Sequence, residues 1–575
     1  MGSFLSRLKE RKLVHWAVAY LAGAWLALQV LDLLATPFAW PALVMRAATV
    51  LLAIGFLAVL VLAWYHGERG RQRVSGIELL MLAGILGIAA AATGLVARGG
   101  PRRPVPAEPT SPTAEEPATE QGSIAVLPFV NMSGDPQQEY FADGLTEELL
   151  NVLAQLPELR VASRTSAFAF KGSKVPVDSI AKALHVAYVL EGSVRNDGGR
   201  LRITAQLINA QNGYHLWSES YDREVSSVFA VQDEIARAIV SALELQLGSG
   251  RAGARLAADE TRDPEAHAAV LQATQLIREG ERPSLERAVA LLQQAIARDP
   301  QYARAYGTLS NAYIVQEYHR WGPREALGDS ARAAADRAIA LDPELAEAHF
   351  AHGLLALDYA QDPRAAAAHF RRGIEANPGA SQIYSQLGWV LAELGDTAGA
   401  VAAGRRAVAL DPLSPGAHNN LGGVYAYTGQ QQRAVEAYRA ALALSSSSST
   451  VANLAVAQAS MGQLEEARRT LEGAYRQAPD EQFVLAAYVH VLARLGQRAE
   501  AERRLRELEA QPEPSPYLLA TAHAGLGNRA RVLELLERSV AEKDPSALDM
   551  AVDPIFAEYR GEPRVQKLLA KMRLR

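Results

Sequence analysis

Residues 381–414, "SQIYSQLGWVLAELGDTAGAVAAGRRAVALDPLS", decide the architecture of most of the chain. The stretch holds two runs with the apolar spacing of helices, separated by Gly-Asp and ended by Asp-Pro. Successive endings of this kind are 43, 35, 34, 34 and 33 residues apart. They fall at Pro300, Pro343, Pro378, Pro412, Ser446 (in the place of a proline) and Pro479. Two helices in every 34 residues predict a solenoid of stacked helix hairpins.

Small and large side chains recur at fixed positions inside this repeat. Small residues let paired helices approach closely, while Leu and Tyr fill the space between them. A 34-residue period with this pattern is typical of the tetratricopeptide repeat (TPR). We predict about eight helix pairs over 264–545, an insertion "EYHRWGPRE" behind the 43-residue gap, and a C-terminal capping segment over 546–575. The matching residues in the quoted stretch are Tyr384, Leu387, Gly388, Leu391, Ala400, Ala407 and Pro412.

The first helix of each TPR pair lines a concave face that usually binds an extended peptide or a partner helix. We therefore predict a protein or peptide ligand on this face, with Trp389 as an anchor for a peptide. The same positions are equally compatible with ordinary solvated surface. The candidate partner-binding residues are Arg304, Asn311, Gln382, Ser385, Trp389, Asn419 and Tyr427.

Residues 122–247 differ from the repeats, because runs typical of strands and of helices alternate there. The runs "SIAVLPF", "AYVLEGSVR", "RLRITAQLI" and "YHLWSESYD" have the composition and alternation of strands, and "NDGG" and "AQNG" are turn stretches. The run "QQEYFADGLTEELLNVLAQL" has helical spacing. This pattern predicts an α/β domain with a mixed sheet.

The residues of this region also resemble a known family. "SIAVLPFVNMSGDPQQEYFADGLTEELL", "YVLEGSVR" and "RITAQLINAQNGYHLWSESYDRE" resemble a domain of bacterial TPR signalling proteins that is related in fold to the TolB amino-terminal domain. The block "FLSRLKERKLVHWAVAYLAGAWLALQVLDLL" resembles the membrane anchor attached to that domain in some relatives. The resemblance implies a scaffold or interaction module without assigned catalytic residues. Relatives with an adenylate cyclase domain or a winged-helix DNA-binding domain exist, and neither pattern is found here.

No catalytic motif is complete in the sequence. "NMSGDP" follows the first strand but has no Lys to hold phosphate, so turn chemistry explains it better. Asp143, Glu147 and Glu148 form an acidic cluster, which we interpret as complementing the positive end of a helix. His349 and His352 form HxxH without the Glu of HExxH, and the chain has no Cys. We predict no enzymatic activity, no cofactor and no metal site.

Three apolar runs, at about 14–34, 41–64 and 79–97, are each as long as a helix needs to cross ~30 Å of hydrocarbon. They predict three transmembrane helices in a membrane anchor over 1–97, followed by a Pro-rich linker over 98–121. The bias of Lys and Arg predicts a cytoplasmic N-terminus and periplasmic residues 98–575. The predicted location is the bacterial inner (cytoplasmic) membrane, with the lipid bilayer as a partner. A net charge of -5 argues against nucleic acid as a partner.

The predicted fold class is multidomain: three transmembrane α-helices, an α/β (mixed sheet) domain like the TolB amino-terminal domain, and an α-solenoid of TPR helix hairpins. The predicted function is a non-enzymatic, membrane-anchored scaffold or adaptor that binds a protein partner through its TPR array. The alternative is a regulatory or sensory component of cyclic-nucleotide or transcriptional signalling, with cytoplasmic TPRs.

Overall fold

The structure is a computed structural model that describes residues 120–574, except for 136–137, 155, 157–158, 198–199, 225–233, 236–237, 240, 243–260 and 262. Residues 120–242 contain a mixed sheet and are called the mixed domain. Its strands are β1 (Glu120–Val126), β2 (Val130–Asn131), β3 (Arg160–Val161), β4 (Val186–Asp197), β5 (Arg200–Asn209) and β6 (His215–Glu224). Its helices with described bounds are α5 (Glu139–Ala154), α6 (Arg164–Phe168) and α7 (Val177–Leu184).

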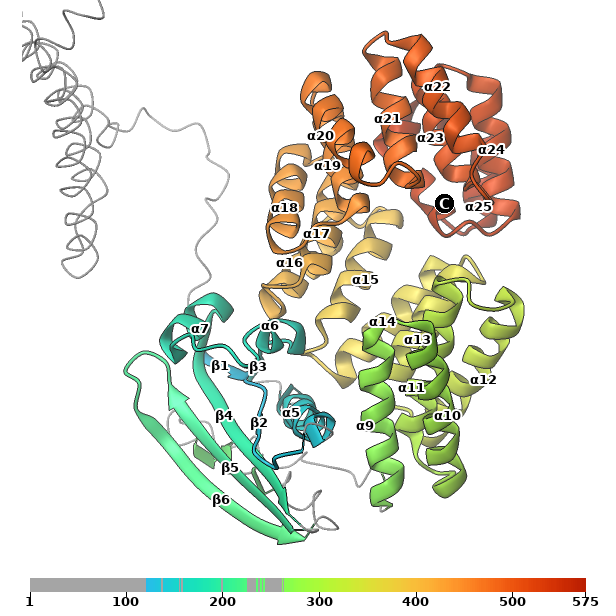
Figure 1. The fold of residues 1–575 in the computed structure, drawn as a ribbon. Helices are drawn as coiled ribbons and strands as arrows, with labels where there is room; N and C mark the ends of the chain where they lie inside the picture. Colours follow the sequence, from blue (N-terminus) through green and yellow to red (C-terminus); the bar gives the residue numbers. More distant parts are fainter. Residues whose placement is uncertain are drawn as a thin grey trace, which may run out of the picture. The chain divides into compact units, whose positions relative to one another are not determined.

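The strand order of the sheet is β3-β1-β4-β5-β6, and β2 also pairs with β4 (Figure 1). β1 runs parallel to β3 and β4, while β4, β5 and β6 form an antiparallel meander. Parallel neighbours need crossover connections, which here contain α5 between β1 and β3, and α6 and α7 between β3 and β4. The register places Leu190 opposite Leu207, and Leu207 opposite Trp217.

Alternation along the strands separates the two faces of the sheet. In β5, Leu201, Ile203, Ala205 and Leu207 are buried, whereas the residues between them are more exposed. The apolar side of α5 packs on this buried face, with Leu145, Leu149 and Leu153 in the shared core. Residues of α7 pack near Val189, which points to the opposite face. The outward side of α5 is therefore left for other contacts.

Helices α9 to α24, residues 264–541, are called the repeat array. The first helices of successive hairpins are called the inner helices, and neighbours such as α15 and α17 contact one another. The inner helices are α9 (Pro264–Glu279), α11 (Ala303–Tyr318), α13 (Ala346–Asp358), α15 (Ser381–Glu393), α17 (Pro415–Tyr427), α19 (Ser448–Ser460), α21 (Gln482–Arg494) and α23 (Pro516–Gly525). Their second helices are α10 (Arg282–Arg298), α12 (Arg324–Leu341), α14 (Pro363–Ala376), α16 (Thr397–Leu410), α18 (Gln431–Leu444), α20 (Leu464–Gln477), α22 (Arg498–Glu509) and α24 (Arg529–Ala541).

Glycines explain both the turns and the close packing of the hairpins. Gly395, Gly429, Gly462 and Gly496 follow inner helices with φ between 76° and 81°, a left-handed conformation that suits Gly at a helix end. On α17, a Cβ added to Gly422 would lie 2.6 Å from the ring of Tyr438 on α18. The missing side chain lets the aromatic ring pack directly on the helix backbone.

The C-terminal cap consists of the 3-10 helices η4 (Pro545–Ala551) and η5 (Pro554–Tyr559) and the helix α25 (Pro563–Lys571). Met550, Phe556 and Leu569 of the cap are buried in one core with residues of the last hairpins, including Leu536 and Val540. The cap therefore covers the apolar end of the array.

The predicted fold class is wrong in its membrane part. Among the residues that the structure describes, no helix combines the length and the apolar character needed to cross a membrane. Even α12, 18 residues long, carries Arg, Asp and Glu along its length. The described chain is mostly helical, with TPR-like hairpins and a small mixed sheet. The predicted spans at 14–34, 41–64 and 79–97 lie outside the described residues.

The predicted location is corrected for the same reason. An inner-membrane protein with periplasmic residues 98–575 is not supported, because no described helix could serve as a span. Bilayer contact through N-terminal helices is likewise not supported. The linker prediction is altered at one end, since β1 already begins at Glu120.

Gly192 on β4 provides a test of the sheet core. A Cβ at this position would meet the carbonyl oxygen of Thr204 and lie 2.6 Å from the ring of Phe129. We expect Gly192→Ala to lower the free energy of unfolding of the mixed domain by about 1–3 kcal/mol, because the packed atoms must shift. Faster amide hydrogen exchange along β4 and β5 measures this loss of stability.

The matched control is Gly473→Ala on α20, where a Cβ would meet nothing within 4 Å. Ala is the better helix former, so this change should stabilise by about 0.5–1 kcal/mol. Equal effects of the two substitutions would contradict the packing described for β4.

Candidate functional site

Two segments of the chain lie against the inner helices. Helix α5 of the mixed domain contacts α9, and η4 of the C-terminal cap contacts α15. The first contact joins an acidic helix to arginines, and the second joins an aromatic pair to a buried carboxyl. Both bear on the surface that TPR proteins use for ligands.

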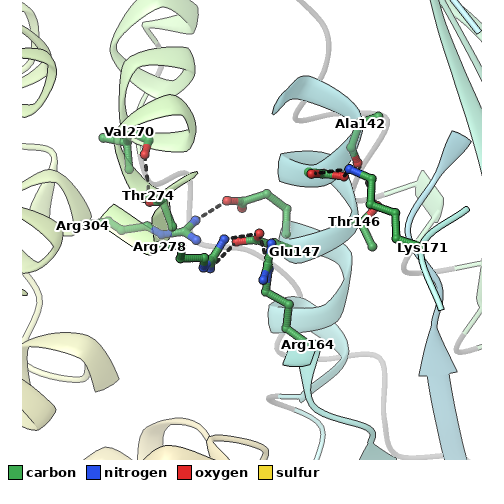
Figure 2. Close-up of polar contacts among 11 residues, drawn as sticks. Ala142, Thr146, Glu147, Arg164, Lys171, Val270, Thr274, Arg278 and Arg304 are labelled. Carbon is green, nitrogen blue, oxygen red and sulfur yellow. Dashed lines mark hydrogen bonds and ion pairs between the residues drawn. The ribbon is translucent and has the colours of Figure 1, made fainter. Parts of the chain in front are cut away.

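Glu147 on α5 is held by two arginines from different domains. Arg278 of α9 forms a bidentate ion pair with its carboxylate, with Nη2 to Oε2 at 2.7 Å. Arg164 of α6, within the mixed domain, donates from Nε to Oε1 of the same carboxylate. Figure 2 shows both guanidinium groups converging on Glu147. The Glu147 side chain is only 8% exposed, whereas the side chains of Arg278 and Arg164 are 37% and 28% exposed, so the pairs are open to solvent on the arginine side.

Glu148, the next residue, pairs with Arg304 of α11. His267 Nε2 of α9 lies 3.8 Å from Glu148 Oε1. Burial by itself would raise the pKa of Glu148, but the charge of Arg304 and the contact with His267 outweigh it and lower the pKa to about 2. Removing one partner of such a buried pair leaves an uncompensated charge, which costs about 3–5 kcal/mol.

The acidic cluster therefore has a different role from the one its position suggested. Glu147 and Glu148 lie well beyond the first turn of α5, which begins at Glu139. Asp143 is bound instead by Lys171 of the mixed domain, with Nζ to Oδ1 at 2.6 Å. The sequence placed these acids on a helix but gave no sign of the arginines that meet them, because Arg278 and Arg304 are more than 130 residues away.

A further polar contact lies at α6. Ser166 donates from its backbone N and its Oγ to Asp411, at 3.0 and 2.5 Å, and its Oγ accepts from Leu413 N at 2.8 Å. The backbone N of Ser163 donates to the carbonyl of Leu410 at 2.7 Å. Asp411 belongs to one of the "ALDP" turns, so a turn residue of the repeat also serves as an acceptor for the mixed domain.

At the other contact, Trp389 of α15 donates from Nε1 to Oδ1 of Asp549 in the cap, at 3.1 Å. Its ring meets Tyr427 of α17 edge to face, with centroids 5.1 Å apart. Tyr517 of α23 donates to Asp553 at 2.8 Å. The aromatic side chain predicted as a peptide anchor thus already binds a segment of its own chain.

The carboxyl groups at this contact lie in low-dielectric surroundings. Burial raises the pKa of Asp549 well above its usual range, and the charge of Asp553 adds to the increase. Burial and the nearby Asp549 likewise raise the pKa of Glu393 on α15. Burial and the charge of Glu317 raise the pKa of Asp358 to about 6. Folding therefore favours the protonated forms of Asp549 and Glu393.

The remaining predicted residues lie on inner helices. Asn419 of α17 accepts from Nδ2 of Asn453 on α19, at 3.4 Å. Asn311 on α11 is half-buried, Gln382 on α15 is exposed, and Ser385 on α15 is buried. The structure thus brings Trp389 and Tyr427 together, and it places Arg304 in the separate α5 contact. The partner-binding role of these residues stays a prediction.

Asn453 was missed from the sequence, although a signal was present. Asn419 and Asn453 are 34 residues apart, one repeat period. Ser385 precedes Asn419 by the same interval. Position-by-position comparison of the repeats would have found this polar row.

The histidines of HxxH have partners within the repeats. His349 Nε2 bonds to the carbonyl of Pro343 at 2.9 Å, and His418 makes the same bond to Pro412. Burial, together with the charges of His352 and His349, lowers the pKa of His369 to about 4. No metal-binding cluster of His, Cys, Asp and Glu is found among the described residues.

Comparison with known proteins identifies two regions. The family described as "Tetratricopeptide repeat" matches residues 354–415 and 406–449. The family described as "HilA/YgeH-like transcriptional regulator, second domain" matches residues 120–238. The predicted similarity of this region to the TolB domain, and the predicted membrane anchor, are not shown by these comparisons.

A curated relative is "Putative adenylate cyclase 3" of Rhizobium meliloti (strain 1021), 41% identical over 216 residues. The match covers 37% of this chain and 37% of the relative, so the chain spans little more than a third of that protein's length.

Similar solved structures include the type IV pilus biogenesis factor PilW, at 16% identity and a TM-score of 0.33 over 38% of this chain and 96% of that chain. Another is YrrB, described as a TPR protein with an unusual peptide-binding site, at 24% identity. Its TM-score is 0.24, and the match covers 32% of this chain and 88% of that chain. A third is Pseudomonas aeruginosa pilF, at 19% identity and a TM-score of 0.30. The match covers 37% of this chain and 92% of that chain. The family match at residues 354–415 and 406–449 shows that the chain contains tetratricopeptide repeats, which its sequence period predicted.

The contact of Trp389 with Asp549 predicts a dependence on pH. A carboxyl whose pKa is raised by folding favours the folded state at low pH. This contribution is lost as the pH rises from the pKa of the carboxyl in the unfolded chain, near 4, to its pKa in the folded chain. We expect Asp549→Asn to raise the unfolding temperature at pH 8 by roughly 2–4 °C, and by less at pH 5. Thermal unfolding of the full chain at the two pH values measures this difference.

Asp549→Ala is the matched control, because Ala cannot accept the bond from Trp389 Nε1. It should lower the unfolding temperature at both pH values, since a buried donor is left without its acceptor. A larger gain for Asp549→Asn at pH 5 than at pH 8 would contradict a raised pKa of Asp549.

Proposed function

We propose that the chain is a non-enzymatic scaffold or adaptor that binds a protein partner through the inner helices of its repeats. TPR arrays are interaction modules, and the proposal goes further by assigning the partner to a defined surface. The observation that carries it is the row of equivalent polar positions at Ser385, Asn419 and Asn453. Asn419 and Asn453 are half-buried, so their amides are partly open to contact.

The chemistry of this row suits a peptide backbone. A carboxamide offers both an acceptor oxygen and two N–H donors, the complement of a main-chain peptide group. Successive amides one repeat apart lie along the array and can follow an extended chain. Bonds to the main chain would give affinity, and side-chain contacts beside them would give specificity.

The proposal of no enzymatic activity is supported by the contacts of the acids and histidines considered as catalytic candidates. The acids of α5 pair with Arg or Lys of the chain, and His349 and His418 bond to backbone carbonyls of their own repeats. These contacts give each group a structural role. A reactive role would require such groups to face a shared substrate.

A second candidate is a regulatory component of cyclic-nucleotide or transcriptional signalling. Two observations favour it: the match of residues 120–238 to a domain of transcriptional regulators, and the relative named as a putative adenylate cyclase. In this case the mixed domain would transmit the state of the repeats to the signalling machinery. The two candidates share a partner on the inner helices and differ in the consequence of binding.

Site-specific photocrosslinking in cells tests the scaffold proposal. A photoreactive residue at Gln382, exposed on inner helix α15, should form a discrete adduct with another protein. The matched control is Ala402, exposed on the second helix α16 of the same hairpin, which should form none. The pair Asn419→Ala and Asn453→Ala should reduce the adduct by about tenfold, because each lost hydrogen bond weakens binding by roughly 0.5–1.5 kcal/mol.

Adducts of equal yield from Gln382 and Ala402 would contradict binding at the inner helices. Adducts that survive the double Asn substitution unchanged would remove the polar row from the binding site.

An assay of purified full chain separates the proposal from cyclase activity. We expect no cyclic AMP from ATP with Mg²⁺ or Mn²⁺, because Asp143 is engaged by Lys171. Turnover that is abolished by Asp143→Asn would overturn the non-enzymatic assignment. A change in cellular cyclic AMP on deletion of the protein, without turnover by the purified chain, would favour the second candidate.

A further inference from the structure

We propose that α5 is an internal ligand of the repeat array, occupying the place at Arg278 and Arg304 where an acidic helix of a partner protein binds. A partner would therefore bind this surface by displacing α5. The inference rests on the proposed function, since it names the chemistry of the partner and the contact that controls its access.

The position of α5 is the first observation. It contacts α9, and its Glu148 pairs with Arg304 on α11, so it lies against the inner helices of the first two hairpins. These are elements that bind helices or peptides in TPR arrays. Helix α5 therefore occupies a ligand position with a segment of the same chain.

The chemistry of the contact is the second observation. The core of the mixed domain and the core of the first hairpins contain separate sets of residues, with Leu145 and Leu149 in one and Val270 and Leu292 in the other. Across the contact, a Cβ on Gly144 would lie 2.6 Å from Leu271 Cδ1, and the other described bonds from α5 to α9 and α11 are ion pairs. Elsewhere, Leu413 of the array packs against a smaller core of the mixed domain. An interface of ion pairs and few apolar contacts can separate without unfolding either side.

The sharing of Glu147 is the third observation. Arg164 belongs to the mixed domain and Arg278 to the array, and both bind the same carboxylate. When the two parts separate, Glu147 keeps Arg164 as its partner. Separation removes Glu147 from Arg278 and Glu148 from Arg304. Each of these two arginines on the inner helices therefore loses a carboxylate.

The two arginines on the inner helices indicate the chemistry of the partner. Two arginines on adjacent inner helices match two neighbouring carboxylates, and α5 presents them as Glu147-Glu148. Bidentate pairing with guanidinium groups favours carboxylates of fixed spacing. We therefore infer a helix with paired Glu residues on the side facing the array and a small residue near Leu271, as Gly144 is in α5.

The chain offers a direct way to fix α5 in place, because it contains no Cys. A Cβ on Gly144 lies 3.1 Å from Cγ of Leu271, and Cβ of Leu271 is one bond beyond. Cysteines at both positions therefore fall near the Cβ separation of about 3.5–4.5 Å that a disulfide needs. Oxidation of Gly144→Cys, Leu271→Cys locks α5 onto α9, and reduction releases the lock.

The probe is a fluorescent peptide with the sequence of Glu139–Ala154, EYFADGLTEELLNVLA. The matched control peptide carries Gln in place of Glu147 and Glu148. Binding is measured by anisotropy to the purified full chain, in the reduced and oxidised forms of the cysteine variant. We expect the reduced form to bind the acidic peptide, and the oxidised form to lose at least about tenfold in affinity, because the internal ligand is held at high effective concentration.

A release variant tests the other direction. Glu147→Gln and Glu148→Gln remove the ion pairs of α5, and Ser166→Ala removes the Oγ bonds of α6 with Asp411 and Leu413 but keeps the backbone bond of residue 166 to Asp411. The full chain with these three changes should bind the acidic peptide at least about tenfold more tightly than the unaltered chain. Adding Arg278→Gln and Arg304→Gln should abolish binding, and the Gln peptide should bind none of the variants.

Circular dichroism and the unfolding temperature of each variant show that the repeats remain folded. Equal binding by the oxidised and reduced forms, no gain in the release variant, or equal binding of the two peptides would each overturn the inference. Loss of the Gln382 adduct in cells would instead count against the scaffold proposal. If that adduct persists while the peptide fails to bind, the scaffold proposal stands and the role of α5 as an internal ligand is wrong.

Discussion

The ion pairs of Glu147 and Glu148 with Arg278 and Arg304 connect the mixed domain to the repeats. Each group is costly to bury alone, and the pairing makes burial tolerable on both sides. The contact therefore favours one arrangement of α5 on the inner helices without requiring a shared apolar core. Its strength depends on the charge of all four groups, and exposed parts of it are screened by salt. A contact of this kind can be stable in the isolated chain and still yield to a ligand that supplies the same charges.

The C-terminal cap uses carboxyl groups in the opposite way. No described cation faces Asp549 as Arg304 faces Glu148, and burial with neighbouring acids raises its pKa. The cap is consequently favoured by protonation, whereas the α5 contact is favoured by ionisation of Glu148. Acidification through the range from about 4.5 to 2 weakens the α5 contact, because the stability from a lowered pKa is lost as the pH falls through it. A rise in pH instead weakens the contact of the cap, because Asp549 then loses its proton. The two contacts on the inner helices therefore respond to opposite changes of pH.

The sequence was sufficient for features that depend on local pattern. The 34-residue period predicted the hairpins, and Gly422 faces Tyr438 as the small and large positions of the repeat require. Strand-like runs separated by turn stretches predicted a mixed sheet, which the structure contains. Features that join distant residues were not predictable. Trp389 meets Asp549 160 residues away, and no periodicity relates the two. The membrane prediction depended on hydropathy, on the bias of Lys and Arg and on the resemblance of the N-terminal block to an anchor, and no described helix supports it.

The placement of the polar row suggests how a partner could reach the surface held by α5. Asn419 and Asn453 lie on α17 and α19, whereas the described bonds of α5 are to α9 and α11. A peptide can thus bind the amides before the contacts of α5 are broken. Once it is bound there, its remaining residues are at high local concentration near Arg278 and Arg304. Both competitors, α5 and the acidic helix of the bound partner, are then tethered close to the two arginines. An acidic helix of moderate intrinsic affinity is therefore sufficient to displace α5.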